Sequence, residues 1–498
     1  MRDENEDILA AEIESAARRV WWLKWIGVFF AVIALVLPVV WVGCGWYSGK
    51  DLRAEIERYR AAGEPILPED FDSPPVPDAD NGALVIQQAA KQFKGVVSKQ
   101  TAELNSLFGD PVVIKERRAE VGKYIALSAE ARGMARRARS LPASDWRVRY
   151  RSPVLWSEPP DLSGDRHLSR MLSIAAIYFH QGGNDAETVE SVRDLLGLAA
   201  HLDRHPSMMY HLVAIAIGGV AGYCLEDTAF DLRIADDRPD VDALSRPATR
   251  AQVRALIGEL LDQEPSRRAL VRALYAERML QLHTARSMVR GQMDFAPTPP
   301  GKTAPVNAER RAMGLIFRPI LERDAVRMMR YTSAWAEAAG QSTWPAFKER
   351  TVQRPEVDSA LQLATHPVSY LMLTDYERIG QLHFRAMTHR RFAATALAIR
   401  LYELDHGRRP ETLDELVPKY LPAVPDDPHA ADGGKIGYKP NAEPPILYSV
   451  NLDGIDQRGE FGLDPEGSVD WEVKDLPFFL NGDRPRPAPT TRSATRTQ

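Results

Sequence analysis

Cysteine, net charge and β-branched runs are the scarce features of this 498-residue chain. It has two cysteines, Cys44 in an apolar segment and Cys224 deep in an apolar helical stretch, so we expect no disulfide between them. The 63 lysines and arginines are matched by 68 aspartates and glutamates, and the net charge of −5 leaves no global basic field to hold nucleic acid. β-branched and aromatic runs are sparse before residue 436, which favours helices.

The familiar catalytic motifs are also missing. The sequence contains no HExxH, no glycine-rich phosphate loop, no GxSxG elbow and no SxxK, and neither cysteine has the neighbours of a reactive thiol. No residue is therefore assigned a catalytic or cofactor-binding role, no small-molecule substrate is identifiable, and we expect a non-enzymatic protein.

Histidine spacing gives only a weak metal signal. His201 and His205 are four residues apart, a spacing that can place two imidazoles on one helix face. A proline ends that helix, so we interpret His205 as a cation at the helix C-terminus, where the dipole favours it. His383 and His389 fit no ligand spacing, and the run His389–Arg390–Arg391 is expected to solvate a long helix.

A membrane-spanning helix is the clearest positive feature. No charged residue occurs from 25 to 49, and about 20 apolar residues cross the hydrocarbon layer at ~1.5 Å per residue. Tryptophan and tyrosine cluster at both ends, as expected of side chains at the two interfaces. We predict a cytoplasmic N-terminus over 1–24 and a transmembrane helix over 25–48. A cleaved signal peptide is the alternative, although the apolar run is long for one.

A second uncharged stretch, 206–225, approaches spanning length. Its histidine, its glycines and its mixed small residues suit close packing inside a protein. We therefore predict a buried helix here and a single membrane span in the chain.

The residues after the span divide by composition. Residues 49–82 are expected to form a short polar helix and then a proline-rich linker, with Asp80 or Asn81 as the N-cap of a helix that begins at Ala83. Over 83–375, apolar residues recur at three- and four-residue intervals. This pattern predicts a helical body, either a bundle or a short α-solenoid, although no fixed repeat is present.

The sequence pattern changes from helical to mixed after residue 406. Gly407 suits the position that follows a helix end, and Pro410 suits the first residue of the next helix. Three segments are strand candidates: 435–440, 446–450 and 469–473. The predicted fold class is mainly α, with the transmembrane helix, the helical body and a small C-terminal α+β module over 376–480. Strand is expected only beyond about residue 430, and the polar tail 481–498 is predicted to be disordered.

The order of features near the C-terminus resembles the globular half of the major pseudopilins of type II secretion. RFAATALAIRLYELDHGRRPETLDELVPKYLPAVPDDP (391–428) has a long helix that ends in Gly-Arg-x-Pro, and ILYSVNLDGIDQRG (446–459) has a strand that delivers a serine and an Asp-Gly to an acidic loop. The leader-peptide cleavage site of that family is not recognisable in this sequence, because no acidic residue stands at the fifth position after Gly27. We interpret the chain as carrying the module without assembling as a pilus subunit.

Three other phrases resemble a family of membrane-anchored helical proteins of planctomycete-type bacteria, which has no assigned activity: RYRAAGEPILPEDF (58–71), PVPDADNGALVIQQA (75–89) and HLVAIAIGGVA (211–221). Basic residues flank both ends of the predicted span, so charge does not choose an orientation. The pseudopilin resemblance implies one, since such modules work outside the cytoplasmic membrane. We expect a bacterial inner-membrane protein with its N-terminus inside and its body in the periplasm.

The pseudopilin resemblance also implies calcium in the acidic loop 449–470. The candidate ligands are Ser449, Asp453, Asp456, Asp464 and Asp470. Calcium takes 6–8 oxygen ligands on a flexible loop, and glycines interrupt this one. The spacing is not that of an EF-hand, and the alternative interpretation is a solvated acidic loop.

The expected function is that of a non-enzymatic scaffold or interaction protein in the envelope, with protein partners there and a link to secretion or envelope assembly. Two alternatives stay open. One is an envelope-anchored hydrolase with a site among the helices, and the other is a divergent secretion-system subunit. A deep pocket with convergent Asp, Glu and His side chains would favour the enzyme.

Overall fold

A computed structural model describes residues 3–72, 74–96, 110–148, 162–235, 246–293, 308–353, 359, 362 and 365–485. The chain forms two compact units. The first comprises Met1–Glu64, Gln281–Met329 and Glu356–Leu373, and the second comprises Pro65–Leu280, Arg330–Pro355 and Thr374–Gln498. The predicted module, 376–480, therefore falls in the same unit as most of the helical body.

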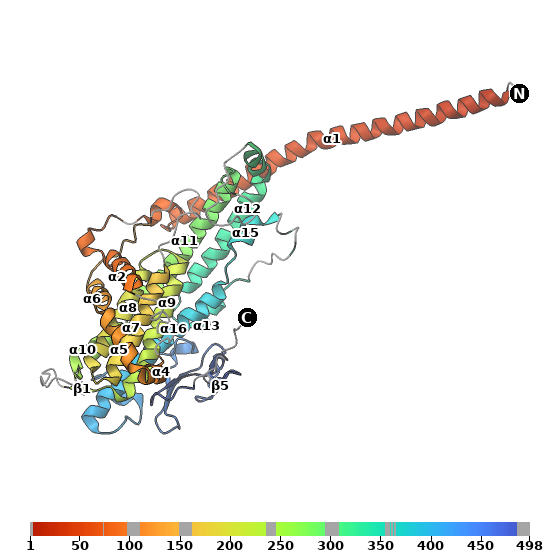
Figure 1. Ribbon diagram of the computed structural model, residues 1–498. Helices are drawn as coiled ribbons and strands as arrows, with labels where there is room; N and C mark the ends of the chain where they lie inside the picture. The colour runs from red at the N-terminus through yellow and green to blue at the C-terminus, as the bar shows by residue number, and fades with distance from the viewer. Residues whose placement is uncertain are drawn as a thin grey trace, which may run out of the picture. The chain divides into compact units, whose positions relative to one another are not determined.

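The described residues are mainly helical, as the sequence predicts (Figure 1). The α-helices are α1 (Asp3–Ala61), α2 (Gly82–Val96), α4 (Pro111–Glu116), α5 (Arg118–Leu127), α6 (Ala129–Arg139), α7 (Leu162–Gln181), α8 (Asp185–Asp203), α9 (Met208–Thr228), α10 (Arg250–Leu261), α11 (Glu264–Val289), α12 (Ala308–Ala339), α13 (Trp344–Glu349), α15 (Pro367–Met372) and α16 (Tyr376–His406). The strands are β1 (Ile234–Ala235), β2 (Ala248–Thr249), β3 (Gly437–Lys439), β4 (Ile446–Ser449), β5 (Phe461–Leu463), β6 (Val469–Lys474) and β7 (Leu476–Phe479).

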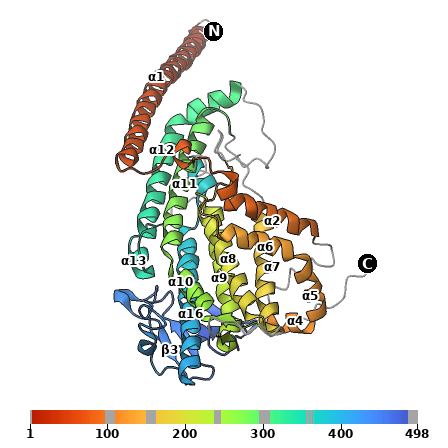
Figure 2. The same cartoon turned by 90° about the vertical axis from the view of Figure 1, so that its left-hand side faces the viewer.

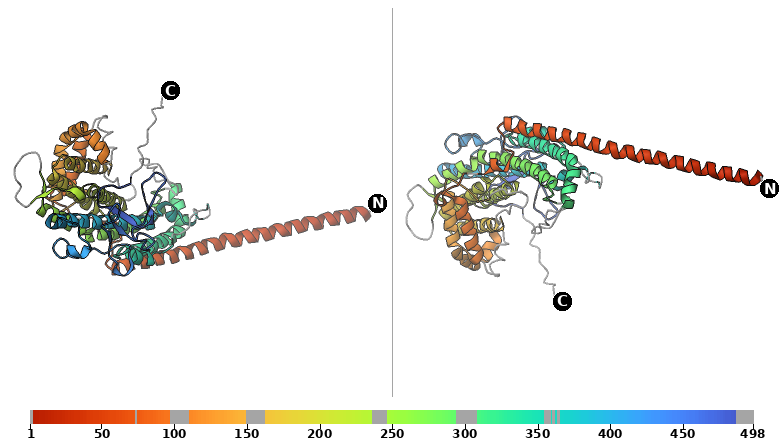
Figure 3. Two further views of the ribbon diagram at one scale, coloured as in Figure 1. Left: turned by 90° about the horizontal axis from the view of Figure 1, so that it is seen from below. Right: turned by 90° about the horizontal axis from the view of Figure 1, so that it is seen from above.

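In the first unit, α1 is one unbroken helix of 59 residues, and Pro38 does not interrupt it (Figure 3). Its apolar segment has a mean hydropathy of 2.7 over the best 18-residue window, and none of that window is buried inside the protein. Exposed side chains include Phe29, Leu35 and Val39. A helix this long and this apolar is able to span a membrane, and a signal sequence has the same property.

The end of α11 and the start of α12 approach each other closely in the same unit. A Cβ on Gly314 would lie 2.4 Å from the carbonyl oxygen of Met288 and 2.5 Å from that of Val289, so only glycine fits there. Farther along α12, the buried Asp324 carboxylate accepts the backbone N–H of Ser369 in α15 at 2.8 Å. Backbone contact and a capping hydrogen bond thus join α11, α12 and α15 within this unit.

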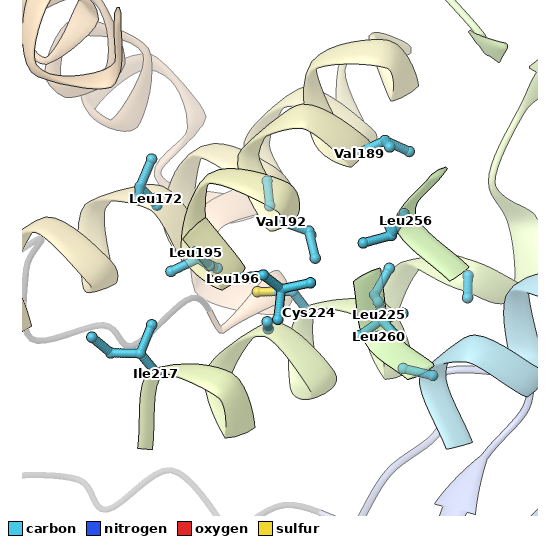
Figure 4. Close-up of a cluster of buried hydrophobic side chains, with 14 of the residues drawn as sticks. Leu172, Val189, Val192, Leu195, Leu196, Ile217, Cys224, Leu225, Leu256 and Leu260 are labelled. Carbon is cyan, nitrogen blue, oxygen red and sulfur yellow. The ribbon is translucent and has the colours of Figure 1, made fainter. Parts of the chain in front are cut away.

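The core of the second unit is a stack of α7, α8 and α9, which lie side by side (Figure 2). Figure 4 shows buried side chains of these helices and of α10 gathered around Cys224. In α8, the predicted periodicity places Val189, Val192 and Leu195 fully inside. Burial of such side chains stabilises the fold by ~1.5–3 kcal/mol each.

The uncharged stretch predicted to be a buried helix is α9. Two-thirds of its most apolar window, 67%, is buried inside the protein, in contacts with α7, α8 and α16. By length and composition it also passes as a membrane span, but its partners are other helices of the unit. Small residues permit this approach: a Cβ on Gly222 would lie 3.3 Å from Cβ of His389 in α16.

The C-terminal strands form a three-stranded antiparallel sheet in the order β3-β4-β7 and a β5-β6 hairpin. All three strand candidates are confirmed, whereas β5 and β7 escaped prediction because they are short and do not alternate. In register, Leu447 pairs with Phe478, and the Phe478 ring packs 5.8 Å from that of Phe392 in α16. The sheet is thereby fixed to the helical core.

Two details of the prediction are wrong and one is right. Strand is not confined beyond residue 430, because β1 and β2 form a two-residue parallel pair that only tertiary packing brings together. Pro410 does not begin a helix: the next turn is a 3₁₀-helix, Leu413–Leu416, capped by Thr412 and Glu415. Gly407 does end α16 in the left-handed conformation, with φ of 68°.

Candidate functional site

Ser449, the first of the predicted calcium ligands, is buried at the end of β4. Its Oγ donates to Asp427 Oδ1 at 2.6 Å, and His429 Nδ1 lies 3.1 Å from the same Oγ. Asp427 also accepts the backbone N–H of Val450 at 2.8 Å. Ser449 thus belongs to a buried Asp427–Ser449–His429 group, which the sequence did not reveal because its members come from separate segments.

Each of the four predicted aspartate ligands makes a local hydrogen bond to the backbone. Their carboxylates accept the backbone N–H two residues on, at 2.7–3.0 Å: Asp453 from Ile455, Asp456 from Arg458, Asp464 from Glu466 and Asp470 from Glu472. Asp453 and Asp456 lie in the turns after β4, whereas Asp464 follows β5 and Asp470 is in β6. The predicted ligands therefore come from the buried end of β4, from the loop that follows it and from the β5–β6 hairpin.

Asp475, which the prediction left out, is the acid close to Asp453 and Asp456. It accepts the N–H of Gly459 at 2.6 Å, while burial and the charges of the two aspartates raise the pKa of Asp475 to about 6. Within the described ranges, no three Asp, Glu, His or Cys side chains come together as a metal cluster. Calcium binding by this loop stays a prediction.

A different feature of the second unit has the dimensions of a ligand site. A cavity of about 560 Å³ opens among α8, α9, α11 and α16, within the 300–1,000 Å³ typical of small-molecule pockets. Its charged lining comprises six arginines and three carboxylates: Arg139, Arg193, Arg204, Arg268, Arg272, Arg390, Asp203, Glu259 and Asp262. His383 also lines it. Arginines outnumber carboxylates in the lining, although Glu190, Asp194 and Glu264 outside it pair with three of them. The remaining arginines favour an anion in the cavity.

Helix periodicity and small residues make room for this cavity. Gly197, Ala199 and Ala200 line it from α8, and Gly218 lines it from α9. A Cβ on Gly218 would meet no atom within 4 Å, so the space beside this buried glycine is open. Larger side chains at these positions would fill the volume that the arginines surround.

The arginines differ in how they are held. Arg139 and Arg193 pair with carboxylates, among them Glu190 of α8. Arg272 Nη2 donates to the carbonyl oxygen of Asp203 at 2.7 Å, and Arg390 Nη2 donates to the carbonyl oxygens of Glu259 and Asp262 at 2.6 and 3.0 Å. Carbonyl oxygens orient a guanidinium without cancelling its charge, so these two arginines keep their positive charge for a further partner.

Burial lowers the pKa of Arg272, Arg390 and Arg204. A lowered arginine pKa means that the surroundings compensate the cation incompletely. The backbone N–H of Arg204 donates to the carbonyl oxygen of Leu202, but its guanidinium makes no hydrogen bond or ion pair with any residue that the structure describes. An anion bound among the three guanidinium groups would supply the missing compensation.

Next to the arginines, three side chains form a buried chain of hydrogen bonds. His211 Nδ1 donates to Asp203 Oδ1 at 2.8 Å, and His211 Nε2 lies 3.2 Å from His383 Nδ1. His383 is 1% exposed, and its Nε2 has no hydrogen-bond partner in the described part of the chain. Burial, with the charges of nearby arginines, holds the pKa of His383 well below its usual value, so His383 is neutral.

The arrangement allows a proton to move between His383 and a ligand. When His211 is neutral, its Nδ1–H donates to Asp203, so His211 Nε2 accepts the hydrogen bond from His383 Nδ1–H. The remaining nitrogen of His383, Nε2, then has no proton and can only accept a hydrogen bond. If His211 takes up a proton, Nε2–H donates instead and His383 Nε2 becomes a donor. Asp203 orients the first ring in either state.

Other buried polar atoms in the lining also lack partners. Besides His383 Nε2, these are Arg390 Nε and Glu259 Oε2, counted over the residues that the structure describes. Buried polar groups in proteins are nearly always hydrogen-bonded, because leaving one unsatisfied costs ~1–3 kcal/mol. Three such atoms in the lining of one cavity indicate that water or a polar ligand completes it.

The interpretation of His205 as a cation at the helix C-terminus is wrong, and His201 is also a buried, neutral ring. His201 Nε2 donates to the carbonyl oxygen of Ala138 at 2.7 Å, and the His205 ring stacks on Tyr210 at 3.9 Å. Burial lowers the pKa of His201 to about 4 and that of His205 to about 3. Both rings are neutral core residues, because desolvation outweighs the helix dipole.

The expectation that His389, Arg390 and Arg391 solvate a helix is also wrong. His389 is buried, Arg390 lines the cavity, and Arg391 Nη1 donates to the carbonyl oxygen of Asp426 at 2.6 Å. Consecutive polar residues on a long helix are usually exposed to water, but much of α16, a helix of 31 residues, is buried inside the second unit. The one sequence feature that indicated burial was the high apolar content of the same helix.

Comparisons with known proteins add no assignment. No family model, no curated protein and no solved structure matches the chain.

Proposed function

We propose that the protein is an envelope protein, anchored by α1 in a bacterial inner membrane with its body in the periplasm, that binds a small anionic ligand in the arginine-lined cavity. The observation that carries the proposal is a cavity of about 560 Å³ in which Arg204, Arg272 and Arg390 have no described carboxylate partner, beside a histidine with an unpartnered nitrogen. A phosphate or carboxylate group fits this chemistry, since guanidinium groups bind planar and tetrahedral oxyanions through paired N–H donors.

The roles of the lining residues follow from how each is held. Arg272 and Arg390 are oriented by carbonyl oxygens, so they bind the anion with little loss of side-chain freedom. The Arg204 guanidinium has no described partner and reaches the ligand as a third cation. His383 Nε2 and Glu259 Oε2 contact the uncharged part of the ligand through hydrogen bonds.

Isothermal titration of the purified full-length protein with pyrophosphate and with citrate tests this function. The test variant is Gly218→Leu, which fills the cavity from a position with open space around it. Gly219→Leu is the matched control, because a Cβ there also meets nothing within 4 Å but Gly219 does not line the cavity. We expect binding of at least one probe to the wild type and to Gly219→Leu, and its loss in Gly218→Leu.

Arg204→Gln should weaken the same binding by about tenfold to a hundredfold, since hydrogen bonds to charged groups contribute ~1.5–3 kcal/mol. Equal binding in the wild type and Gly218→Leu would show that the anion sits elsewhere. Absence of binding by both probes would remove support for the cavity as an anion site, and the scaffold function expected from the sequence would then be the simpler one.

A second candidate, an envelope hydrolase, is favoured by the Asp203–His211–His383 chain. A cavity with convergent Asp, Glu and His side chains is the feature expected of an enzyme, and His383 Nε2 is placed to take or give a proton. Turnover of chromogenic phosphate and carboxylate esters measures this activity. We expect it to be lost in His383→Gln, which retains anion binding, and kept in Gly219→Leu. Turnover that survives in His383→Gln would contradict the role of His383.

Orientation has its own test. A phosphatase that folds only in the periplasm, fused after Gln498, should be active, and the same enzyme fused after Met1 without the rest of the chain should be inactive. Activity of a cytoplasm-only reporter at Gln498 would reverse the orientation and leave the cavity chemistry unaffected.

A further inference from the structure

The start of α12 exposes an apolar surface beside the anchor helix, within the first unit. Met313, Leu315 and Ile316 are 40%, 51% and 56% exposed. Met313 and Ile316 are three residues apart and share a face, and Leu315 lies on the other flank of Ile316. The three therefore cover the side of α12 that faces away from the buried Gly314. An apolar patch of this kind marks a contact with another molecule or a membrane. The basic residues Arg310 and Arg311 precede it.

Three contacts fix the position of this patch along α1. The indole N–H of Trp41 donates to the carbonyl oxygen of Ile316 at 2.8 Å. A Cβ on Gly45 would lie 3.7 Å from Pro319 Cγ, and Ser48 Oγ donates to Glu322 Oε2 at 2.8 Å. From 41 to 48, α1 therefore runs beside α12 from 316 to 322.

Trp41 gives the depth of these contacts. Tryptophan rings gather at the boundary between hydrocarbon and headgroups, and Trp41 stands at the end of the apolar run opposite to Trp21. Lys50, the first charged residue after that run, lies ~13 Å farther along the helix axis at 1.5 Å per residue. Ile316 thus lies at the level of the interfacial layer if α1 spans a membrane.

We propose that the first turns of α12 form a second membrane contact, in which Met313, Leu315 and Ile316 enter the interfacial layer of an anionic bilayer. Because α12 runs in the same direction as α1, Arg310 and Arg311 lie about 8–9 Å closer to the bilayer centre than Ile316 along the helix axis. Their long side chains then extend back toward the lipid phosphates, where each basic residue adds attraction to an anionic surface. The proposal rests on the membrane anchoring of α1 that is part of the proposed function. Its consequence is that the first unit is held to the bilayer at two places, so it is restrained from turning about the anchor.

The test uses the full-length protein in vesicles of phosphatidylcholine and phosphatidylglycerol, with an environment-sensitive label on single cysteines. Cys44→Ser provides the parent chain, and the buried Cys224 stays unlabelled. The label is placed at Leu315→Cys, at Leu35→Cys in the span and at Glu57→Cys on the same α1 helix. Leu35 is 73% exposed, and the Glu57 side chain is 68% exposed.

We expect bromolipid to quench the label at 315 and 35 but not at 57, and aqueous iodide to do the reverse, with several-fold differences. Arg311→Gln should reduce lipid quenching at 315 without changing it at 35. If lipid quenches the label at 35 while the label at 315 is quenched only by iodide, as at 57, the second contact is absent and α1 alone anchors the protein. If 315 is shielded from both quenchers, protein covers the patch and the proposal is overturned. Iodide access at 35 would refute the anchor as well.

Discussion

His211 Nε2 lies 3.2 Å from His383 Nδ1, although the two histidines are separated by 172 positions in the sequence. Both residues are 1% exposed, and Asp203 Oδ1 accepts a hydrogen bond from His211 Nδ1, the ring nitrogen that does not face His383. Only one proton occupies the contact between the two rings, so the hydrogen-bonding state of the cavity depends on the protonation of a buried pair. This relationship joins α9 to α16 and places a chain of hydrogen-bonded side chains at the wall of the arginine-lined cavity.

Acid should destabilise the fold through its buried neutral histidines, and His201 offers a test. Burial lowers the pKa of His201 from 6.5 to about 4. Its contribution to stability is fully present above pH 6.5 and is lost as the pH falls toward 4, because the unfolded chain takes up the proton first. Urea unfolding at pH 7 and 4.5 should show a smaller loss in His201→Asn than in the wild type, by about 1–3 kcal/mol. An equal loss in both would show that His201 does not couple to folding.

Alkali should act through His180, which has the opposite shift. Burial alone would lower the pKa of His180, but hydrogen bonds to Asp185 and Asp231 overcome it and raise the pKa to about 9. The stabilisation is complete below pH 6.5 and disappears as the pH rises through 9, because the folded state holds its proton longer than the unfolded chain. Between pH 6 and 9.5, the wild type should lose about 1–3 kcal/mol more than His180→Gln. Parallel curves for the two proteins would contradict this assignment.

Gly314→Ala should destabilise the first unit. The new Cβ would lie 2.4–2.5 Å from two carbonyl oxygens of α11, and backbone atoms cannot move away as a side chain does. We expect a loss of ~1–3 kcal/mol, typical of overpacking, measured by denaturant unfolding. The control is Gly258→Ala in α10, where the Cβ meets no atom within 4 Å and the better helix propensity of alanine should stabilise by up to ~1 kcal/mol. Comparable stability of the two variants would show that the α11–α12 approach is looser than described.

Calcium at the acidic loop is a further prediction. If Asp453 is a ligand, millimolar calcium should raise the thermal midpoint of the full-length protein and leave that of Asp453→Ala unchanged. A ligand that binds only the folded state adds RT ln(1 + [L]/Kd), about 2.7 kcal/mol at a hundredfold excess over Kd. Asp475→Asn serves as a second probe, since this buried acid lies near Asp453 and Asp456. Identical shifts of the thermal midpoint in the wild type and Asp453→Ala would show that Asp453 only hydrogen-bonds the loop backbone and does not bind calcium.

Much of the architecture was determined by the sequence itself, because it depends on neighbours along the chain. The apolar run of α1, the 3.6-residue periodicity of α8 and the glycine that ends α16 are each decided by local backbone preference and by the spacing of apolar side chains. Asn81 was correctly predicted to cap α2, since its Oδ1 accepts the N–H of Ala83 at 3.2 Å. These features need no knowledge of which helices meet.

The candidate site was decided by tertiary structure alone. Ser449 looked like the start of an acidic loop, yet it donates to Asp427 inside the protein. Arg390 looked like a solvated cation, yet packing of α16 against α9 and α10 places it at the cavity wall. A polar residue has the same local signature whether its helix face meets water or another helix, because the difference lies in the desolvation and the partners that distant segments supply. Hence the sequence determined where the helices begin and end, and only their packing determined which arginines and histidines converge.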